Sequence, residues 1–439
     1  MGTIGHSGRT QSASESVSTA VSDAQIWAAV DAEADWMLDL LERLVRAPTV
    51  LGNEEPGQVV MEQAYRDLGL DPSALPLDAD AIRADPHSSP FSWDVSGKRN
   101  VLATWEAGGG GGRSLILNGH VDVVPPASEA LWTGPPFEPR RYGDWLIGRG
   151  AGDMKAGLVA IAGAVRGLRR LGVAPLAPIH LQSVVEEECT GNGALQCLLS
   201  GPTADACVIA EPHSDHITVA QVGVLWLHVE IRGRPAHAAS ADALGFNAID
   251  AAAAVTRALR ELEAELNLAP PPPYDLFAHP INLNVGAIRG GDWTSTVAAE
   301  CTISYRLACY PDDRPADLRR RVEHAIAVAA AADSFLAENP PRLRYDGFTC
   351  EGFSLSPHEP VAVALSAAYG RFVGAAAPLL ATTATTDARH FVRRGIPAVC
   401  FGPRAQEVHG IDERVSIGSM VQSAKVLAAF IQDWCGLTT

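Results

Sequence analysis

The chain has 439 residues, a length that favours two domains over a single hydrophobic core. Hydrophobic residues make up 47% of it, which is typical of a globular protein in water. The formal net charge of −17 argues against a nucleic-acid partner and against an anionic membrane surface. No apolar run reaches the roughly 18–20 residues that a membrane-spanning helix needs, so we expect no membrane association.

The cysteines and the N-terminal residues indicate the cellular compartment of the protein. Eight cysteines are scattered along the chain without a Cys-x-x-Cys pair, so a thiolate zinc site is not expected. Most lie in apolar runs and are typical of buried free thiols, which indicates a cytoplasmic location. Residues 1–23 lack the apolar core of a signal peptide and are rich in Ser, Thr and Gly, so we predict a disordered leader there.

The first half of the chain alternates between helical and strand patterns. Apolar residues at helical spacing predict one amphipathic helix over residues 23–47, ended by Pro48. Five glycines at 108–112 are expected to form a hairpin loop between two strands. The other predicted helices are 59–68, 155–171 and 193–199, and the predicted strands are 100–105, 114–118, 179–185 and 206–210. This alternation predicts an α/β fold with a mostly parallel sheet, which binds ligands beyond the carboxyl ends of its strands.

The pattern changes after about residue 218. The predicted elements there are strands at 219–233, 281–288, 296–309 and 342–345, with helices at 247–266 and 315–332. They indicate a compact α+β insert with its own small sheet. Helices at 360–372 and 418–434 and a strand at 398–401 then return to the α/β pattern. We therefore predict a catalytic metal-binding domain over 24–218 and 351–439, interrupted by an inserted domain over 219–350.

His120 and Asp122 follow an apolar strand, Leu115-Ile116-Leu117-Asn118. Residues two apart in a strand share a face, so one side chain can bind a metal while the other supports the site. A His-x-Asp pair alone is weak evidence. The pair gains meaning only from the acidic residues and the histidine that follow it in the chain.

Asp153 lies in a glycine-rich loop, Gly148-Arg149-Gly150-Ala151-Gly152, before a predicted helix. A phosphate-binding loop is the alternative interpretation. Its spacing does not match, because Lys155 is followed by Ala and Gly where such a loop needs Ser or Thr. A carboxylate held in a tight turn is better suited to bridging two metals.

Glu186, Glu187 and Glu188 end a predicted apolar strand. Three adjacent buried carboxylates are costly unless a cation compensates them, although a solvated acidic turn is the simpler interpretation. Neighbouring residues could divide the work, one as metal ligand and one as general base. Glu211 and His409 would each be unremarkable alone. With His120 and Asp153 they complete a set that indicates a dinuclear metal site.

Taken in order, these motifs resemble those of the metallohydrolase family of acetylornithine deacetylase, succinyl-diaminopimelate desuccinylase, aminoacylase-1 and glutamate carboxypeptidase. The resemblance covers essentially the whole chain after about residue 24, and several motifs in order are far more specific than one. It implies an enzyme, a dinuclear metal-dependent amidohydrolase or metallopeptidase. Imidazole and carboxylate ligands suit two divalent ions, zinc in the first place and cobalt or manganese as alternatives.

The resemblance also implies a role for each residue. His120 and Glu211 would bind one metal, Glu188 and His409 would bind the other, and Asp153 would bridge them. Asp122 would orient His120. Counting back from Gly193-Ala194 makes Glu187 the general base and Glu188 the ligand.

The insert resembles the lid and dimerisation domain of the same family, which implies a homodimer. The segments Gly233-Arg234-Pro235-Ala236-His237 and Gly245-Phe246-Asn247-Ala248 carry this match. His237 would reach the active site of a partner subunit and polarise the scissile carbonyl. Arg306 would bind a substrate carboxylate, and Asn247 is a second expected substrate contact.

The predicted activity is removal of the acyl group from a small, carboxylate-bearing N-acyl amino acid, as in acetylornithine deacetylase. The chain departs from relatives at residues 295–298 and 382–387, which border the substrate pocket in the family. A carboxypeptidase or dipeptidase, or a hydrolase of a less usual C–N bond such as an aryl amine, therefore remains an alternative. A non-catalytic binding protein would need a broken metal set, and every expected ligand type is present.

Overall fold

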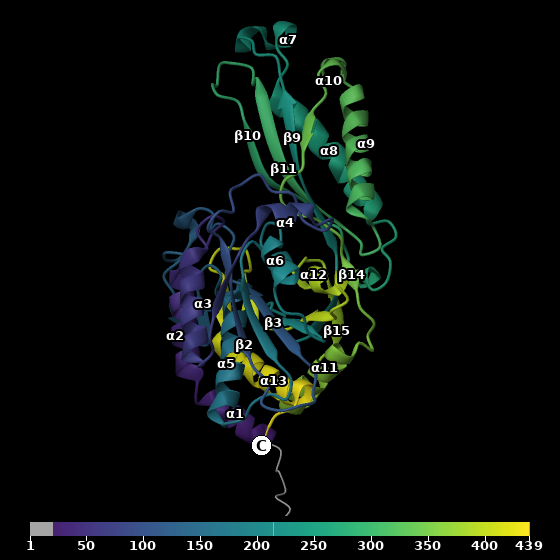
Figure 1. The fold of residues 1–439 in the computed structure, drawn as a ribbon. Coiled ribbons are helices and arrows are strands. Elements are labelled where there is room, and N and C mark those ends of the chain that lie inside the picture. Colours follow the sequence, from purple (N-terminus) through teal and green to yellow (C-terminus); the bar gives the residue numbers. More distant parts are fainter. Residues whose placement is uncertain (1–20, 214, 439) are drawn as a thin grey trace, which may run out of the picture.

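The computed structural model describes residues 21–213 and 215–438. A large domain built around a wide sheet carries an insert at one end, and Figure 1 shows the insert standing above the large domain. The insert comprises residues 223–350. The predicted class is confirmed: the chain has an α/β domain with a mainly parallel sheet, together with an α+β insert.

The central strands of the large sheet are parallel. In the described residues the sheet has nine strands, ordered β1-β2-β6-β3-β7-β16-β8-β14, with β15 beside β8. Their bounds are β1 Ser73–Pro76, β2 Arg99–Trp105, β3 Leu115–His120, β6 Ile179–Val184, β7 Cys207–Ile209, β8 Ile217–Gln221, β14 Phe353–Ser354, β15 Leu379–Thr382 and β16 Ala398–Cys400. Strands β6, β3, β7 and β16 run parallel, while β1, β2 and β14 pair in antiparallel fashion. Every residue of β3 and β6 is buried, as expected for strands covered on both faces.

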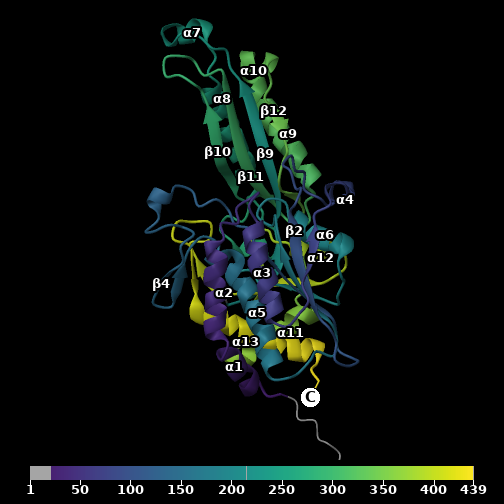
Figure 2. The ribbon, with the colours of Figure 1, turned by 60° about the vertical axis from the view of Figure 1, so that its left-hand side comes forward.

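Two groups of helices cover this sheet. In the first, α5 contacts α1, α2 and α13, and α13 also contacts α11 (Figure 2). In the second, α6 contacts α4, α12 and the strands β2 and β6. The bounds are α1 Asp23–Asp31, α2 Ala34–Arg46, α3 Glu55–Asp67, α4 Ala79–Ala84, α5 Ala156–Arg170, α6 Asn192–Ser200, α11 Pro360–Val373, α12 Ala388–Arg393 and α13 Ile417–Cys435. Among the described helices, none is both long enough and apolar enough to cross a bilayer.

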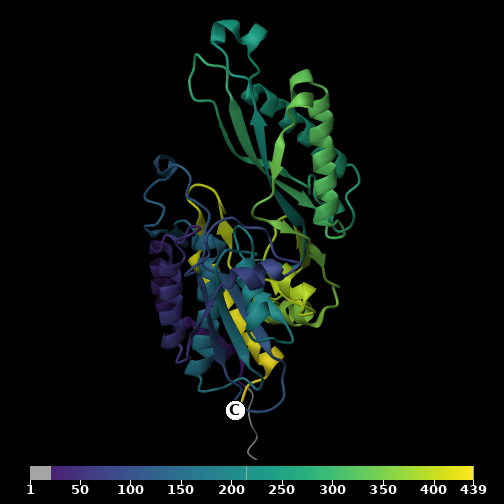
Figure 3. The same cartoon turned by 45° about the horizontal axis from the view of Figure 1, so that its top comes forward.

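The insert is a five-stranded antiparallel sheet with helices on one side (Figure 3). Its strands are β9 Gly223–Arg232, β10 Leu283–Gly290, β11 Glu300–Cys309, β12 Arg342–Arg344 and β13 Thr349–Cys350, and its helices are α7 Ala241–Leu244, α8 Ala248–Leu266, α9 Pro315–Ala331 and α10 Ser334–Glu338. Along β9 and β11 buried residues alternate with half-buried ones. The buried side chains pack with α8 and α9, so the half-buried ones form the opposite face of the sheet.

A small four-stranded sheet joins two distant parts of the large domain. Its order is β17-β18-β5-β4, with β4 Arg140–Tyr142, β5 Trp145–Ile147, β17 Ala405–Gln406 and β18 Arg414–Ser416. Strands β5 and β18 pair in antiparallel register from Trp145↔Ser416 to Ile147↔Arg414. The loop after β5 and the loop before β18 therefore leave this sheet side by side.

Two predicted elements each divide into two in the structure. The helix expected over 23–47 is two helices, and Glu33 at the corner between them accepts hydrogen bonds from Arg166 and Arg170 of α5. The strand expected over 219–233 divides at Val222, because β8 belongs to the large sheet and β9 to the insert. The predicted domain boundary at 218/219 consequently falls inside β8.

The hairpin expected around the glycines at 108–112 does not form. Strand β6 lies between β2 and β3, so these glycines connect strands that are not neighbours. The loop instead packs against the end of the chain. Gly108 donates its N–H to the carbonyl of Pro175, and a side chain at Gly112 would meet the carbonyl of Cys435.

We predict that Gly112→Ala destabilises the protein by about 1–3 kcal/mol, measured as the free energy of unfolding in urea. Gly112 has a φ of +76°, and an added Cβ would lie 1.9 Å from the carbonyl oxygen of Cys435. Gly110→Ala is the matched control, since nothing lies within 4 Å of the Cβ it adds. Equal stability of the two variants would contradict this account of the loop.

Candidate metal centre

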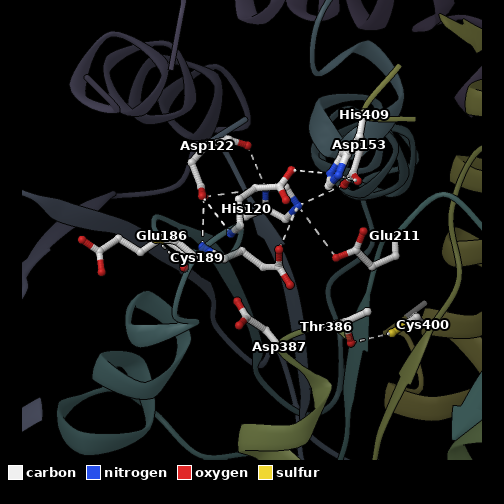
Figure 4. A network of polar contacts seen from close by, with 12 residues as sticks. His120, Asp122, Asp153, Glu186, Cys189, Glu211, Thr386, Asp387, Cys400 and His409 are labelled. Carbon is white, nitrogen blue, oxygen red and sulfur yellow. Dashed lines mark hydrogen bonds and ion pairs between the residues drawn. The ribbon is translucent and has the colours of Figure 1, made fainter. Parts of the chain in front are cut away.

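The carboxyl ends of the parallel strands meet at one edge of the large sheet. His120 is the last residue of β3, Glu187 and Glu188 follow β6, and Glu211 follows β7. The chain beyond β16 leads to His409. Figure 4 shows His120, Glu211 and His409 converging there, as expected for ligands bound beyond the carboxyl ends of parallel strands.

Asp153 stands between two sets of possible ligands. Its Oδ1 lies 3.2 Å from Nε2 of His120, and its Oδ2 lies 3.3 Å from Nε2 of His409. Glu211 Oε1 is 3.8 Å from the same nitrogen of His120, and Glu188 Oε1 is 3.1 Å from that of His409. Two groups of three side chains with metal-binding geometry result, and they share Asp153. One carboxylate oxygen therefore faces each group.

Asp122 organises the site through both its backbone and its side chain. Nδ1 of His120 donates to the backbone carbonyl of Asp122 at 2.9 Å, which leaves Nε2 turned towards Asp153. The carboxylate of Asp122 accepts the backbone N–H groups of Glu187 at 3.2 Å and Glu188 at 3.1 Å. Its Oδ1 also lies 3.7 Å from Nδ1 of His120, an ion-pair contact, so its expected role in orienting the imidazole stays a prediction. Its hydrogen bonds hold the two glutamates in place.

Glu186 points away from the metal-binding groups (Figure 4). Its carboxylate accepts hydrogen bonds from Trp93 Nε1 at 2.8 Å, Lys98 Nζ at 2.7 Å and Thr190 Oγ1 at 3.0 Å. A φ of +64° at Glu186 turns the chain there, and Glu187 and Glu188 line the cavity described below. The three adjacent glutamates thus divide into one with a structural ion pair and two at the site.

Burial and crowding shift the pKa values of these groups. Burial raises the pKa of Glu187 well above its ordinary value, and the carboxylates of Asp387 and Glu211 raise it further. Burial alone would lower the pKa of His409, but the Glu188 carboxylate and the hydrogen bond of Asp153 raise it to about 11. The acidic cluster therefore draws positive charge to itself, as protons or as metal ions.

The residues fit divalent metal ions. Within residues 21–213 and 215–438, the carboxylates of the two ligand groups form ion pairs only with the two imidazoles, and no Lys or Arg neutralises them. Glu187 Oε1 is buried without a hydrogen-bond partner among the described residues, which is costly unless a cation or a bound molecule satisfies it. The donors are imidazole nitrogens and carboxylate oxygens, a set that suits zinc, cobalt or manganese.

A cavity of about 970 Å³ connects the two ligand groups with the insert. Its far wall is the half-buried face of the insert sheet, where Arg306 stands opposite Trp226 on β9 and Asn284 on β10. The sequence-predicted Arg306 thus shares the cavity with the metal-binding groups. A volume near this size is typical of small-molecule sites.

His237 and Asn247 lie elsewhere within the chain. His237 is exposed close to α7 at the far tip of the insert (Figure 1), and its Nδ1 accepts the N–H of Ala239 at 3.1 Å. Asn247 precedes α8, and its side-chain oxygen caps that helix by accepting the N–H of Ile249 at 2.9 Å. Neither residue lines the cavity of its own chain.

Sequence reasoning overlooked three residues beside the site. Asp387 is buried next to the cavity-lining Thr386, with no hydrogen-bond partner for either carboxylate oxygen in the described part of the chain. Arg149 and Glu413 form a buried ion pair behind the ligand loops. Glu413 follows His409 by four residues, but no local pattern distinguishes it from a surface acid.

Comparison with known proteins decides the family. The model of peptidase family M20/M25/M40 matches residues 116–433. The chain belongs to this family. It is therefore an enzyme, an amidohydrolase or peptidase of a metal-dependent family, which confirms the resemblance inferred from the motifs.

Curated relatives include two hydrolases with about the same degree of similarity. The N-formyl-4-amino-5-aminomethyl-2-methylpyrimidine deformylase of Bacillus subtilis is 29% identical over 341 residues, covering 73% of this chain and 79% of that protein. The succinyl-diaminopimelate desuccinylase of Paracoccus denitrificans is 29% identical over 351 residues, covering 78% and 88%. Among solved structures, the Saccharomyces cerevisiae di-peptidase Dug1p shares the fold with a TM-score of 0.78 at 15% identity, covering 94% of this chain and 98% of that one.

We predict that Glu188→Gln halves the divalent-metal content of the purified protein, because it removes a charged side chain from the group of Asp153 and His409. Glu186→Gln should keep the full metal content, although it weakens the buried pair with Lys98 and lowers the melting temperature. Metal ions per chain by mass spectrometry, beside a thermal melt, test both variants. Loss of metal from Glu186→Gln but not from Glu188→Gln would reverse the assignment.

Proposed function

We propose that the protein hydrolyses the amide bond of a small N-acyl amino acid at two divalent metal ions. His120, Asp153 and Glu211 would hold one ion, and Asp153, Glu188 and His409 the other. The observation that carries the proposal is the cavity that joins these groups to Arg306. A substrate with an amide at one end and a carboxylate at the other would place the amide at the metal-binding groups and the carboxylate at Arg306.

Bound metal ions would supply Lewis acidity and lower the pKa of water towards about 7. Glu187 is the candidate general base, because its Oε1 is buried at the cavity and has no other partner in the described residues. It would take a proton from the attacking water at this oxygen and deliver it to the leaving amine. The backbone N–H groups of Glu187 and Glu188 both donate to Asp122, and these hydrogen bonds fix the position of this segment at the cavity.

Arg306 would bind the substrate carboxylate. It forms no ion pair with the residues that the structure describes, while the opposite side of the cavity is lined with acidic groups. A guanidinium pairs with a carboxylate through two parallel hydrogen bonds, which would orient the substrate with its amide towards the acidic side.

His237 would act only in a homodimer formed through the insert, since it is remote from the cavity of its own chain. Strand β10 is one edge of the insert sheet, and the exposed Ile288 and Trp293 lie on it and in the loop that follows. A second insert pairing there would extend the sheet and could carry His237 and Asn247 towards a neighbouring site. All eight cysteines are buried and free, which supports the proposed cytoplasmic location.

A second candidate is hydrolysis of an amide attached to an aromatic group. Trp226 lies beside Arg306 on the cavity wall, with Phe348 edge-on to it at 5.5 Å between ring centroids. A relative that removes formyl groups from a pyrimidine derivative is about as similar as the desuccinylase. A panel of N-formyl, N-acetyl and N-succinyl amino acids, dipeptides and aromatic amides would separate these activities.

We expect Glu187→Gln to lower kcat by roughly 10²–10⁴-fold while two metal ions remain bound. The amide has nearly the same shape as the carboxylate but cannot accept the proton of water. Steady-state rates on the best substrate of the panel, with metal content measured on the same sample, test this. Wild-type turnover in the fully loaded variant would exclude Glu187 as the base.

We expect Arg306→Ala to raise KM for N-acyl amino acids by at least tenfold, with a smaller change in kcat. Amides without a carboxylate should be hydrolysed as well as by the wild type, since they never make this ion pair. Arg342→Ala, which replaces an exposed arginine on β12, serves as the matched control. Equal losses on both kinds of substrate would count against a carboxylate-binding role.

A further inference from the structure

A buried ion pair lies behind the two loops that carry Asp153 and His409. Arg149 Nη1 donates to Glu413 Oε2 at 2.6 Å, and both side chains are only 1% exposed. Arg149 follows β5 by two residues, and Glu413 immediately precedes β18. The pair therefore stands where the two neighbouring strands of the small sheet release their loops.

Glu413 holds the loop of Asp153 entirely by accepting hydrogen bonds. Its Oε1 accepts the N–H of Gly152 and that of Asp153, each at 2.9 Å. Its Oε2 accepts the N–H of Gly150 at 3.0 Å in addition to the arginine. All four partners are donors, so only a carboxylate, with acceptors on both atoms, satisfies the arrangement.

Arg149 holds the loop of His409 with its other terminal nitrogen. Nη2 donates to the carbonyl of Gly410 at 3.0 Å and to that of His409 at 3.4 Å. This loop needs support, since His409 has a φ of +61° and Asp412 a φ of +55°, conformations that side chains disfavour. The ion pair thus connects the backbones of two ligands that lie far apart in the sequence.

The two ligand groups depend on this pair to different degrees. In the group of Asp153, Glu188 and His409, two of three ligands lie on loops that the pair holds. In the group of His120, Asp153 and Glu211, only Asp153 does, and the other two lie at or just beyond the ends of β3 and β7. The side chain of His409 is also 50% exposed, whereas that of His120 is 1% exposed.

We infer that Arg149 and Glu413 are positioning residues that set the affinity of the metal site formed by Asp153, Glu188 and His409. The inference rests on the proposed metal centre and assigns the pair no contact with substrate. Residues that orient metal ligands commonly change metal affinity by 10–100-fold. The pair should therefore control whether the second ion stays bound when metal is scarce.

Cobalt titration of metal-free protein tests the inference without any substrate. Calorimetry and the visible absorption of bound cobalt should show two binding events in the wild type. In Glu413→Gln the amide N–H₂ must face at least one backbone donor, so we expect one event to weaken at least tenfold while the other changes less than threefold. Arg149→Lys keeps the positive charge but loses the second terminal nitrogen of the guanidinium. The cobalt affinity of its weaker site should lie between that of the wild type and that of Glu413→Gln.

Two further variants distinguish a specific effect on metal binding from a loss of folding. The double variant Arg149→Met/Glu413→Gln removes both charges and leaves no unpaired buried ion, so it should fold and still lose the weaker site. Glu263→Gln is the matched control, because Glu263 is a buried insert carboxylate that also accepts an arginine and a backbone N–H. Circular dichroism confirms folding of each metal-free protein.

The outcomes separate the pair from the proposed function. Two unchanged binding events in the folded variants, or equal weakening of both, would overturn the role of the pair. A wild type with two events but no amidase activity would instead contradict the proposed function and leave the pair's role standing. Weakening of one event in the pair's variants, with Glu263→Gln like the wild type, is the supporting result.

Discussion

The structure depends on holding many carboxylates together at one edge of a sheet. Asp153, Glu187, Glu188 and Glu211 gather there with two imidazoles, and Asp122 contacts this group through the backbone of Glu187. Charges buried this way are costly unless they are paired or hydrogen-bonded. Backbone N–H groups stabilise two neighbouring carboxylates, Asp122 and Glu413, by donating hydrogen bonds to them. The remaining negative charge is what a pair of divalent ions would balance.

Topology brings these acids together from distant parts of the chain. The parallel strands β6, β3 and β7 direct their carboxyl ends to the same edge, which gathers His120, the glutamate pair and Glu211. Asp153 and His409 do not follow directly on strands of this sheet. They arrive through the pairing of β5 with β18, which places their loops next to each other. Two sheets of different size therefore assemble one site.

The side chains that the sequence grouped together do lie close to one another, whereas some predicted connections between elements are wrong. His120, Asp153 and Glu188 stand in local patterns, a strand end or a glycine-rich turn, that carry their own chemical meaning. The glycines at 108–112 have the composition of a hairpin, but whether β6 inserts between β2 and β3 depends on long-range pairing. Glu413 was missed for the same reason, since its partners are backbone groups of a distant loop. Candidate ligands can be predicted from short sequence segments, whereas strand order and buried ion pairs depend on contacts between distant segments.

The length of the insert separates His237 from the other residues predicted to act at the site. Its sheet presents Arg306 and Trp226 near the large domain, while His237 lies close to α7, which Figure 1 shows at the opposite end of the insert. Strands β9 and β11 are each ten residues long, and a strand rises about 3.3 Å per residue, so the two ends lie roughly 30 Å apart. No side-chain rearrangement spans such a length. A role for His237 in catalysis therefore requires a second insert to approach the cavity, whereas the proposed metal ligands and Arg306 all lie within a single chain.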